Sequence, residues 1–134
     1  MKKQLEGRNI VGIDIVKISR IESMLEKFGK KALERFLSED EISLGNSPKS
    51  YAGFWASKEA VSKALGCGIG KECSFFDIKL KKDKKGKPYF LLSKRLIQNY
   101  SIQNTSLSIT HDGEYAVAVA VVETTFCKEK DLSF

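Results

Sequence analysis

The sequence holds one histidine and three cysteines, which is too little for a Cys/His metal site or a framework of disulfide bonds. Cys67, Cys73 and Cys127 are odd in number and form no Cys-x-x-Cys pair, so we expect free thiols. No apolar run approaches the roughly 20 residues that span a bilayer, and the start MKKQLE lacks the apolar segment of a signal peptide. We therefore expect no membrane partner and a cytoplasmic location.

Acidic residues are the scarcer charge, with 17 Asp and Glu against 23 Lys and Arg and a net charge of +6. This excess favours an acidic partner such as a nucleotide, an acidic protein, RNA or a membrane surface. Aromatic residues are not interleaved with basic ones as in RNA-recognition modules, so we expect no nucleic-acid partner. The length of 134 residues predicts a single domain over 1–134, with about 124–134 as a loosely ordered tail.

Hydrophobic periodicity and capping signals predict an α+β fold in which a small antiparallel sheet packs with a long helix. The long helix is the most clearly bounded element, because Ser47 and Pro48 are start signals and Gly66 is a stop signal. The other predicted elements are a buried strand at 9–15, a helix at 18–28 that ends at Gly29, a short helix capped by Ser38 and Glu41, a hairpin of strands 74–82 and 88–91, a helix at 93–100, and a second hairpin around Asp112-Gly113 that ends near Glu123.

The last predicted strand is apolar on both faces. Its side chains alternate between valine at 117, 119 and 121 and alanine at 116, 118 and 120. A strand of this kind is covered on both sides, and a small domain achieves this most easily by forming an oligomer.

Three charged residues are candidates for phosphate and metal chemistry. Glu59 and Lys63 lie four residues apart on the long helix and therefore share a face. The same spacing is typical of a simple surface ion pair. Asp14 ends an apolar strand. An aspartate at this position is often the N-cap of the following helix, which is the alternative to a metal ligand. Mg²⁺ is commonly held by one or two carboxylates plus substrate phosphates, so Asp14 and Glu59 would suffice if the fold brought them together.

A glycine-rich loop follows the helix, with glycines at 66, 68 and 70. It lacks the Gly-Lys-Ser/Thr ending of a P-loop, and Gly66 is also needed as a helix cap. The helix C-terminus carries negative partial charge, so Lys58 and Lys63 are the candidates for attracting phosphate. His111 precedes the second hairpin turn, where both a structural histidine and a ligand contact fit the sequence.

Taken together, these segments resemble the holo-(acyl-carrier-protein) synthase family of phosphopantetheinyl transferases. The similarity runs in order through VGIDIV, FLSEDE, WASKEAVSKALGCGIG, GKP and SITHDGEYAVAVAVVE, and reaches about Glu123. The resemblance implies the fold of that family and the transfer of 4′-phosphopantetheine from coenzyme A to a serine of apo acyl carrier protein. The released product would be adenosine 3′,5′-bisphosphate, and the reaction would support fatty acid biosynthesis.

The resemblance also implies roles for the candidate residues. Asp14 and Glu59 would hold Mg²⁺, and Glu59 would take the serine proton directly or through a metal-bound water. Lys63 would stabilise or protonate the leaving group. Coenzyme A would be bound by Lys58, Lys63, the glycines at 66, 68 and 70, and His111.

Assembly and docking follow from the same resemblance. Family members form trimers with active sites between subunits, and the acidic carrier would dock near Arg20. Many relatives carry a basic residue where this chain has Phe54, so one phosphate contact differs here. The alternative from a different class is a non-catalytic basic module that binds RNA or an acidic protein, a reading that leaves Asp14 and Glu59 without a purpose.

Overall fold

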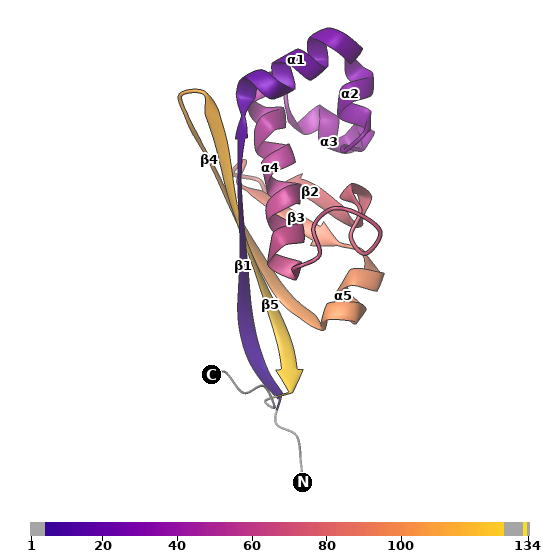
Figure 1. Ribbon diagram of the computed structural model, residues 1–134, viewed down its shortest axis with the longest axis vertical. Helices are drawn as coiled ribbons and strands as arrows, with labels where there is room; N and C mark the ends of the chain where they lie inside the picture. Colours follow the sequence, from indigo (N-terminus) through magenta and orange to yellow (C-terminus); the bar gives the residue numbers. More distant parts are fainter. Residues whose placement is uncertain (1–4, 128–132, 134) are drawn as a thin grey trace.

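The computed structural model of the protein describes residues 5–127 and Ser133. It has the predicted α+β class, with a long helix against an antiparallel sheet (Figure 1). In chain order the elements are β1 (Leu5–Lys17), α1 (Ile18–Phe28), α2 (Lys30–Glu34), α3 (Glu39–Leu44), α4 (Pro48–Leu65), the 3₁₀ helix η1 (Phe75–Asp77), β2 (Ile78–Lys82), β3 (Pro88–Leu92), α5 (Lys94–Tyr100), β4 (Ile102–Asp112) and β5 (Tyr115–Cys127).

The long helix α4 has the predicted bounds. The Ser47 side chain accepts a hydrogen bond from the Ser50 amide, and Pro48 occupies the first turn, where its missing N–H costs nothing. Gly66 ends the helix in the left-handed conformation at φ 80°. The predicted capping box of the short helix α3, between Ser38 and Glu41, is also formed. Local capping chemistry therefore fixes the helix that carries three candidate residues.

Three long strands form the main sheet in the order β1-β5-β4, all antiparallel, while β2 and β3 form a separate pair. Helix α4 packs on β1 and β5, and Figure 1 shows α1, α2 and α3 gathered at one end of the long sheet with α5 toward the other. In this register Asp14 lies opposite Ala118, and both belong to the face that α4 covers. The sheet and α4 together therefore form the framework of the candidate site.

Several predicted boundaries were wrong. Strand β2 begins at Ile78 and not at Ser74, because the Ser74 side chain caps the turn η1. The residues between the paired positions Asp112 and Tyr115 are 113 and 114, so the hairpin turn lies one residue later than predicted. Strand β5 continues through residue 127, which places 124–127 of the predicted tail in the sheet, and 128–132 and 134 lie outside the described residues.

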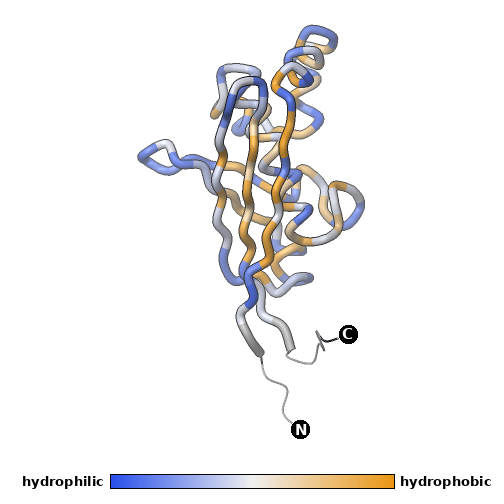
Figure 2. Tube along the Cα trace, turned by 60° about the vertical axis from the view of Figure 1, so that its left-hand side comes forward, coloured by the Kyte–Doolittle hydropathy of each residue, from blue (hydrophilic) through white to orange (hydrophobic). Residues whose placement is uncertain are grey.

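The first predicted strand is not buried on both faces. Val11, Ile13 and Ile15 are 62%, 58% and 61% exposed in the single chain, while Gly12 and Val16 on the other face are buried beneath α4. Figure 2 shows hydrophobic residues along both β1 and β5. Because Ile13 pairs with Val119, the exposed side chains of β1 and the half-buried valines of β5 form one continuous apolar face. We call this surface, formed by residues 11, 13, 15, 117, 119 and 121, the valine-isoleucine face.

Gly12 sets the distance between β1 and α4. A Cβ built on Gly12 would lie 1.8 Å from the Ala60 carbonyl oxygen and 2.5 Å from the Ala64 amide nitrogen. Both are backbone atoms, so no side-chain rotation relieves the overlap. Only glycine in β1 permits this close approach of strand and helix.

We expect Gly12→Ala to destabilise the fold by about 3 kcal/mol, the upper part of the range for overpacking. The free energy of unfolding in urea measures this change. Gly7→Ala is the matched control in the same strand, because its Cβ would meet only the Glu123 side chain, at 3.8 Å. Equal stability of the two variants would contradict the close-approach argument.

Candidate active site

The fold brings Asp14 of β1 and Lys63 of α4 into direct contact across 49 positions of the sequence. The Lys63 Nζ donates a hydrogen bond of 2.7 Å to Asp14 Oδ1. The Asp14 side chain is 14% exposed and that of Lys63 is 52% exposed, so the pair lies at the edge of the core with access to solvent. Asp14 is not a helix cap, because α1 begins only at Ile18, after Lys17.

Glu59 lies within electrostatic range of this pair. Its pKa is raised above the usual carboxylate value, chiefly by burial and then by the negative charge of Asp14, while Lys63 and Arg20 act in the opposite direction. Two carboxylates and a lysine from β1 and α4 therefore lie together, which the residue pattern alone left open. A carboxylate with a raised pKa is a better proton acceptor than an exposed one, which suits a general base.

The two carboxylates fit a Mg²⁺ site of the kind that substrate phosphates complete. Mg²⁺ prefers oxygen ligands, and Asp14 and Glu59 supply them from two rigid elements. No group of three or more His, Cys, Asp or Glu side chains that could hold a metal occurs within the described residues. The donor set therefore fits an ion held jointly with a phosphate ligand and does not fit an all-protein metal cage.

The glycine loop begins next to Lys63. Gly66 and Gly68 have φ angles of 80° and 66°, a region that glycine adopts without strain. The Gly68 amide bonds back to the Ser62 carbonyl and the Gly70 amide bonds to the Cys73 carbonyl, so the loop is tied to both of its ends. Its position beside Lys63 agrees with a role near phosphate, although the first two glycines are also explained by backbone conformation alone.

Lys58 does not belong to this group, and its contacts give no support to the predicted role at coenzyme A. Its side chain is fully buried, and Nζ donates to Glu41 Oε1 at 2.9 Å and to the carbonyl oxygens of Phe36 at 2.7 Å and Phe75 at 3.0 Å. Three acceptors use all three ammonium protons. Lys58 therefore joins α4 to the segments around it and has no proton left for a phosphate.

His111 lies on the opposite edge strand of the main sheet from Asp14, on the same face, which α4 covers. Its Nε2 is 3.1 Å from the Lys49 carbonyl oxygen, and its ring lies against Gly53 in the first half of α4. Strand β5 separates β4, which carries His111, from β1, which carries Asp14. A single chain therefore does not bring His111 to the carboxylates, and the hydrogen bond to Lys49 accounts for its place in one chain.

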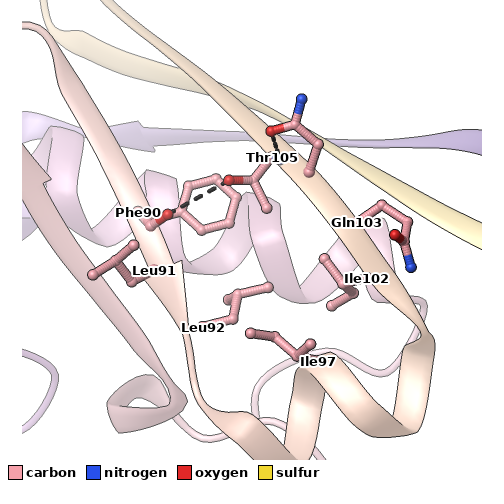
Figure 3. A pocket seen from close by; sticks show the side chains of 8 residues that line it. Phe90, Leu91, Leu92, Ile97, Ile102, Gln103 and Thr105 are labelled. Atoms are coloured by element: carbon pink, nitrogen blue, oxygen red, sulfur yellow. Dashed lines mark hydrogen bonds between the residues drawn. The ribbon is translucent and has the colours of Figure 1, made fainter.

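A pocket of about 200 Å³ lies between β3, α5 and the start of β4 (Figure 3). Figure 3 shows apolar side chains around it, and one wall is fixed by a hydrogen bond from the Thr105 hydroxyl to the Phe90 carbonyl oxygen. The complete lining is Phe90, Leu91, Leu92, Ile97, Ile102, Gln103, Asn104 and Thr105. No charged side chain lines this pocket, so it does not suit a phosphate group.

The roles of two residues in the framework around the site were missed in the sequence. Gly12 controls how closely α4 approaches Asp14, and a glycine inside an apolar strand is itself a signal of close backbone approach. Glu41 was predicted only as a capping residue, yet it also accepts bonds from Lys58 and from the Leu80 amide. No local pattern could have revealed that second role, because the partners lie 17 and 39 positions away.

Residues 10–120 match the family model of the 4′-phosphopantetheinyl transferase superfamily. The chain belongs to this superfamily. Among curated relatives, it is 54% identical to the holo-[acyl-carrier-protein] synthase of Sulfurimonas denitrificans over 116 residues, which cover 87% of this chain and 96% of that protein. It is 55% identical to the enzyme of the same name from Nautilia profundicola, over 84% of this chain and 98% of the relative.

A solved structure agrees with these matches. The crystal structure of Helicobacter pylori holo-[acyl-carrier-protein] synthase in complex with coenzyme A superposes with a TM-score of 0.82 at 53% identity. The match covers 84% of this chain and 99% of the other. This phosphopantetheinyl transferase therefore has the fold of its relatives, and the binding-module alternative is not favoured. Among the helices of the described residues, none combines the length and hydropathy required to cross a membrane.

Proposed function

We propose that the protein is a holo-[acyl-carrier-protein] synthase that transfers 4′-phosphopantetheine from coenzyme A to a serine of apo acyl carrier protein. Adenosine 3′,5′-bisphosphate is the second product, and the modified carrier serves fatty acid biosynthesis. The observation that carries this proposal is the convergence of Asp14, Glu59 and Lys63, from β1 and α4, in a chain more than half identical to named synthases. The coenzyme A complex of the Helicobacter pylori relative supports the choice of donor.

Each converging residue has a task in this reaction. Glu59, with its raised pKa, accepts the proton of the attacking serine hydroxyl. Lys63 stabilises the phosphate that departs with the nucleotide, and its 52% exposure gives it access to a bound ligand. Asp14 and Glu59 would hold Mg²⁺, which when bound neutralises pyrophosphate charge. Attack by an alcohol on the phosphorus of a negatively charged phosphate needs each of these contributions.

The nucleotide half of coenzyme A is assigned to the loop beside Lys63. The backbone from Gly66 to Gly70 lies next to that lysine, and a Cβ at 66, 68 or 70 would meet no atom within 4 Å, so the loop presents open space to a ligand. His111 would line the same ligand from a neighbouring subunit, because β5 separates it from Asp14 within one chain. The carrier would dock at Arg20, which is exposed on α1 and lies within electrostatic range of Glu59.

The proposed assembly is a homotrimer with sites between subunits, as the family resemblance implies. The valine-isoleucine face is the surface that association would cover, because three of its side chains on β1 are more than half exposed in the single chain. Such a contiguous apolar face marks an interaction site on a small domain.

Ile13→Asp places a charge in the middle of this face, so we expect the trimer to dissociate and the transferase activity to be lost with it. Light scattering after size-exclusion chromatography measures the assembly. Leu91→Asp is the control, because Leu91 is 51% exposed on β3, outside the valine-isoleucine face. A trimer that persists in Ile13→Asp would contradict this assignment of the interface.

The transfer reaction itself is tested by mass spectrometry. The purified protein is incubated with apo acyl carrier protein, coenzyme A and Mg²⁺, and the intact mass of the carrier is recorded with and without a metal chelator. We expect a gain of one phosphopantetheine that the chelator prevents. A folded apo carrier that stays unmodified would overturn the proposed function, and a gain insensitive to chelation would overturn the role of Mg²⁺.

A further inference from the structure

Trp55 on α4 is fixed in orientation by two aromatic neighbours. Its ring meets Phe36 edge-on, with centroids 5.0 Å apart at 77°, and Phe75 in a tilted contact at 5.1 Å and 47°. Phe36 is fully buried, so the cluster is anchored in the core. Trp55 itself is only partly buried, which leaves part of its indole facing outward.

Arg20 of α1 lies over the indole of Trp55. The guanidinium carbon is 5.0 Å from the ring centroid, within the range of a cation–π interaction. Arg20 is exposed, and no carboxylate in residues 5–127 lies within ion-pair distance of its guanidinium. The aromatic ring is thus the contact that the structure gives this cation. From a greater distance, its charge acts to lower the pKa of Glu59.

We propose that Trp55 is a positioning residue that holds the Arg20 guanidinium ready to receive a carboxylate of the acidic carrier protein. This inference rests on the proposed function and adds to it the residue on which docking through Arg20 depends. Trp55 acts through Arg20 and has no part in binding coenzyme A.

The physical reason is preorganisation. A free arginine side chain populates many rotamers, and a carboxylate that binds it must first restrict them. A guanidinium over an aromatic face is already restricted, while the N–H groups at its edge stay available for a bidentate carboxylate. Lysine cannot replace arginine in this arrangement, because its ammonium is a compact charge without a planar edge.

The test compares Michaelis constants for carrier and coenzyme A in Arg20→Lys, Trp55→Phe and Trp55→Leu. We expect Trp55→Leu to raise KM for the carrier about two- to fivefold, the ratio that an exposed cation–π contact supports, with KM for coenzyme A changing far less. Trp55→Phe keeps a ring and should give a smaller rise. Arg20→Lys keeps the charge and leaves the core intact, so a rise in KM for the carrier there reports the loss of the planar contact without any question of folding.

A double-mutant cycle separates positioning from a merely structural effect. If Trp55 acts through Arg20, Trp55→Leu has no further effect on KM for the carrier once Arg20→Ala is present. The chain offers a matched control in Arg35, whose guanidinium lies 5.0 Å over the Phe28 ring. Phe28→Leu removes the same type of contact and should leave KM for the carrier within about twofold, the lower end of the expected effect.

The outcomes separate this inference from the proposed function. Two results would overturn the positioning role and leave the docking site intact. In the first, KM for the carrier rises in Arg20→Ala but not in Trp55→Leu. In the second, Trp55→Leu changes this KM equally with and without Arg20. No rise with Arg20→Ala would overturn both docking at Arg20 and its positioning. Neither result touches the transfer reaction, which the mass of the carrier decides.

Fluorescence supplies a readout that needs no turnover, because Trp55 is the only tryptophan of the chain. Titration with an apo carrier that lacks tryptophan should change the Trp55 emission, since the neighbouring guanidinium exchanges water for a carboxylate. We expect this change to be lost in Arg20→Ala and kept in Phe28→Leu. An identical change in Arg20→Ala would show that the indole does not sense docking through Arg20 and would contradict the proposal.

Discussion

Glu59→Gln is expected to lower kcat by about 10²- to 10⁴-fold, the usual contribution of a general base. Glutamine has nearly the same shape as glutamate but accepts no proton at neutral pH, and its neutral amide is a weaker ligand for Mg²⁺. The measurement is the initial rate of carrier modification over a range of Mg²⁺ concentrations. Glu39→Gln is the control, because Glu39 pairs with Lys30 at the exposed start of α3. Turnover equal to the parent protein at saturating Mg²⁺ would contradict the role of Glu59.

The pH dependence follows from the same residue. Burial and the charge of Asp14 raise the pKa of Glu59, so its basic form is reached at higher pH than for an exposed carboxylate. In the metal-free protein, NMR titration of Glu59 should therefore give a midpoint above the ordinary value for glutamate, about 4.3. In the metal-free protein, Asp14→Asn removes one of the two causes, so NMR titration should give a lower Glu59 pKa in that variant.

The second large effect is expected from Lys58→Met. Methionine keeps most of the volume of lysine but removes the ammonium that balances buried Glu41, which is 2% exposed. Breaking a buried ion pair from one side costs about 3–5 kcal/mol, because the remaining charge stays without its partner. The carbonyl oxygens of Phe36 and Phe75 also lose their donor. The free energy of unfolding measured in urea should fall by this amount.

The double variant Lys58→Met with Glu41→Leu tests the origin of that loss. It removes both charges, so stability should recover in part. Recovery stays incomplete, because the Ser38 and Leu80 amides lose the Glu41 carboxylate that accepts their hydrogen bonds at 2.8 Å. A loss below about 1 kcal/mol in Lys58→Met would contradict a charge-balancing role, since that is no more than an exposed pair contributes.

The parts of the fold that sequence predicts are those with local causes. The bounds of α4 were correct because Ser47, Pro48 and Gly66 act within one turn of the backbone. The end of β1 was wrong for the opposite reason. Asp14 is a residue type that is common at helix N-caps, but pairing with β5 continues the strand to Lys17. That pairing joins segments about a hundred positions apart, and no local signal reports it.

The site was predictable in part on the same grounds. That Glu59 and Lys63 share a face follows from the helix period. Their meeting with Asp14 depends on how β1 packs on α4, and only the family resemblance led us to expect it. The buried ion pair of Lys58 was not predicted, although Lys58 is next to Glu59. Successive side chains on a helix point about 100 degrees apart, so Lys58 faces a different direction from Glu59. Whether that direction meets solvent or another segment depends on tertiary packing. Here Phe36, Glu41 of α3 and Phe75 of η1 surround the ammonium and the lysine is buried.

The packing of α4 on the sheet has a thermodynamic consequence. The contact is made largely by glycine and alanine, with Gly12, Ala60, Ala64, Ala116, Ala118 and Ala120 all buried. These residues have no side-chain rotamers to lose, so this layer of the core orders without the entropy cost that longer side chains incur. Rotamer exchange therefore cannot alter the spacing between strand and helix. The distance between the backbones that carry Lys63 and Asp14 should therefore vary little as the protein is warmed toward unfolding.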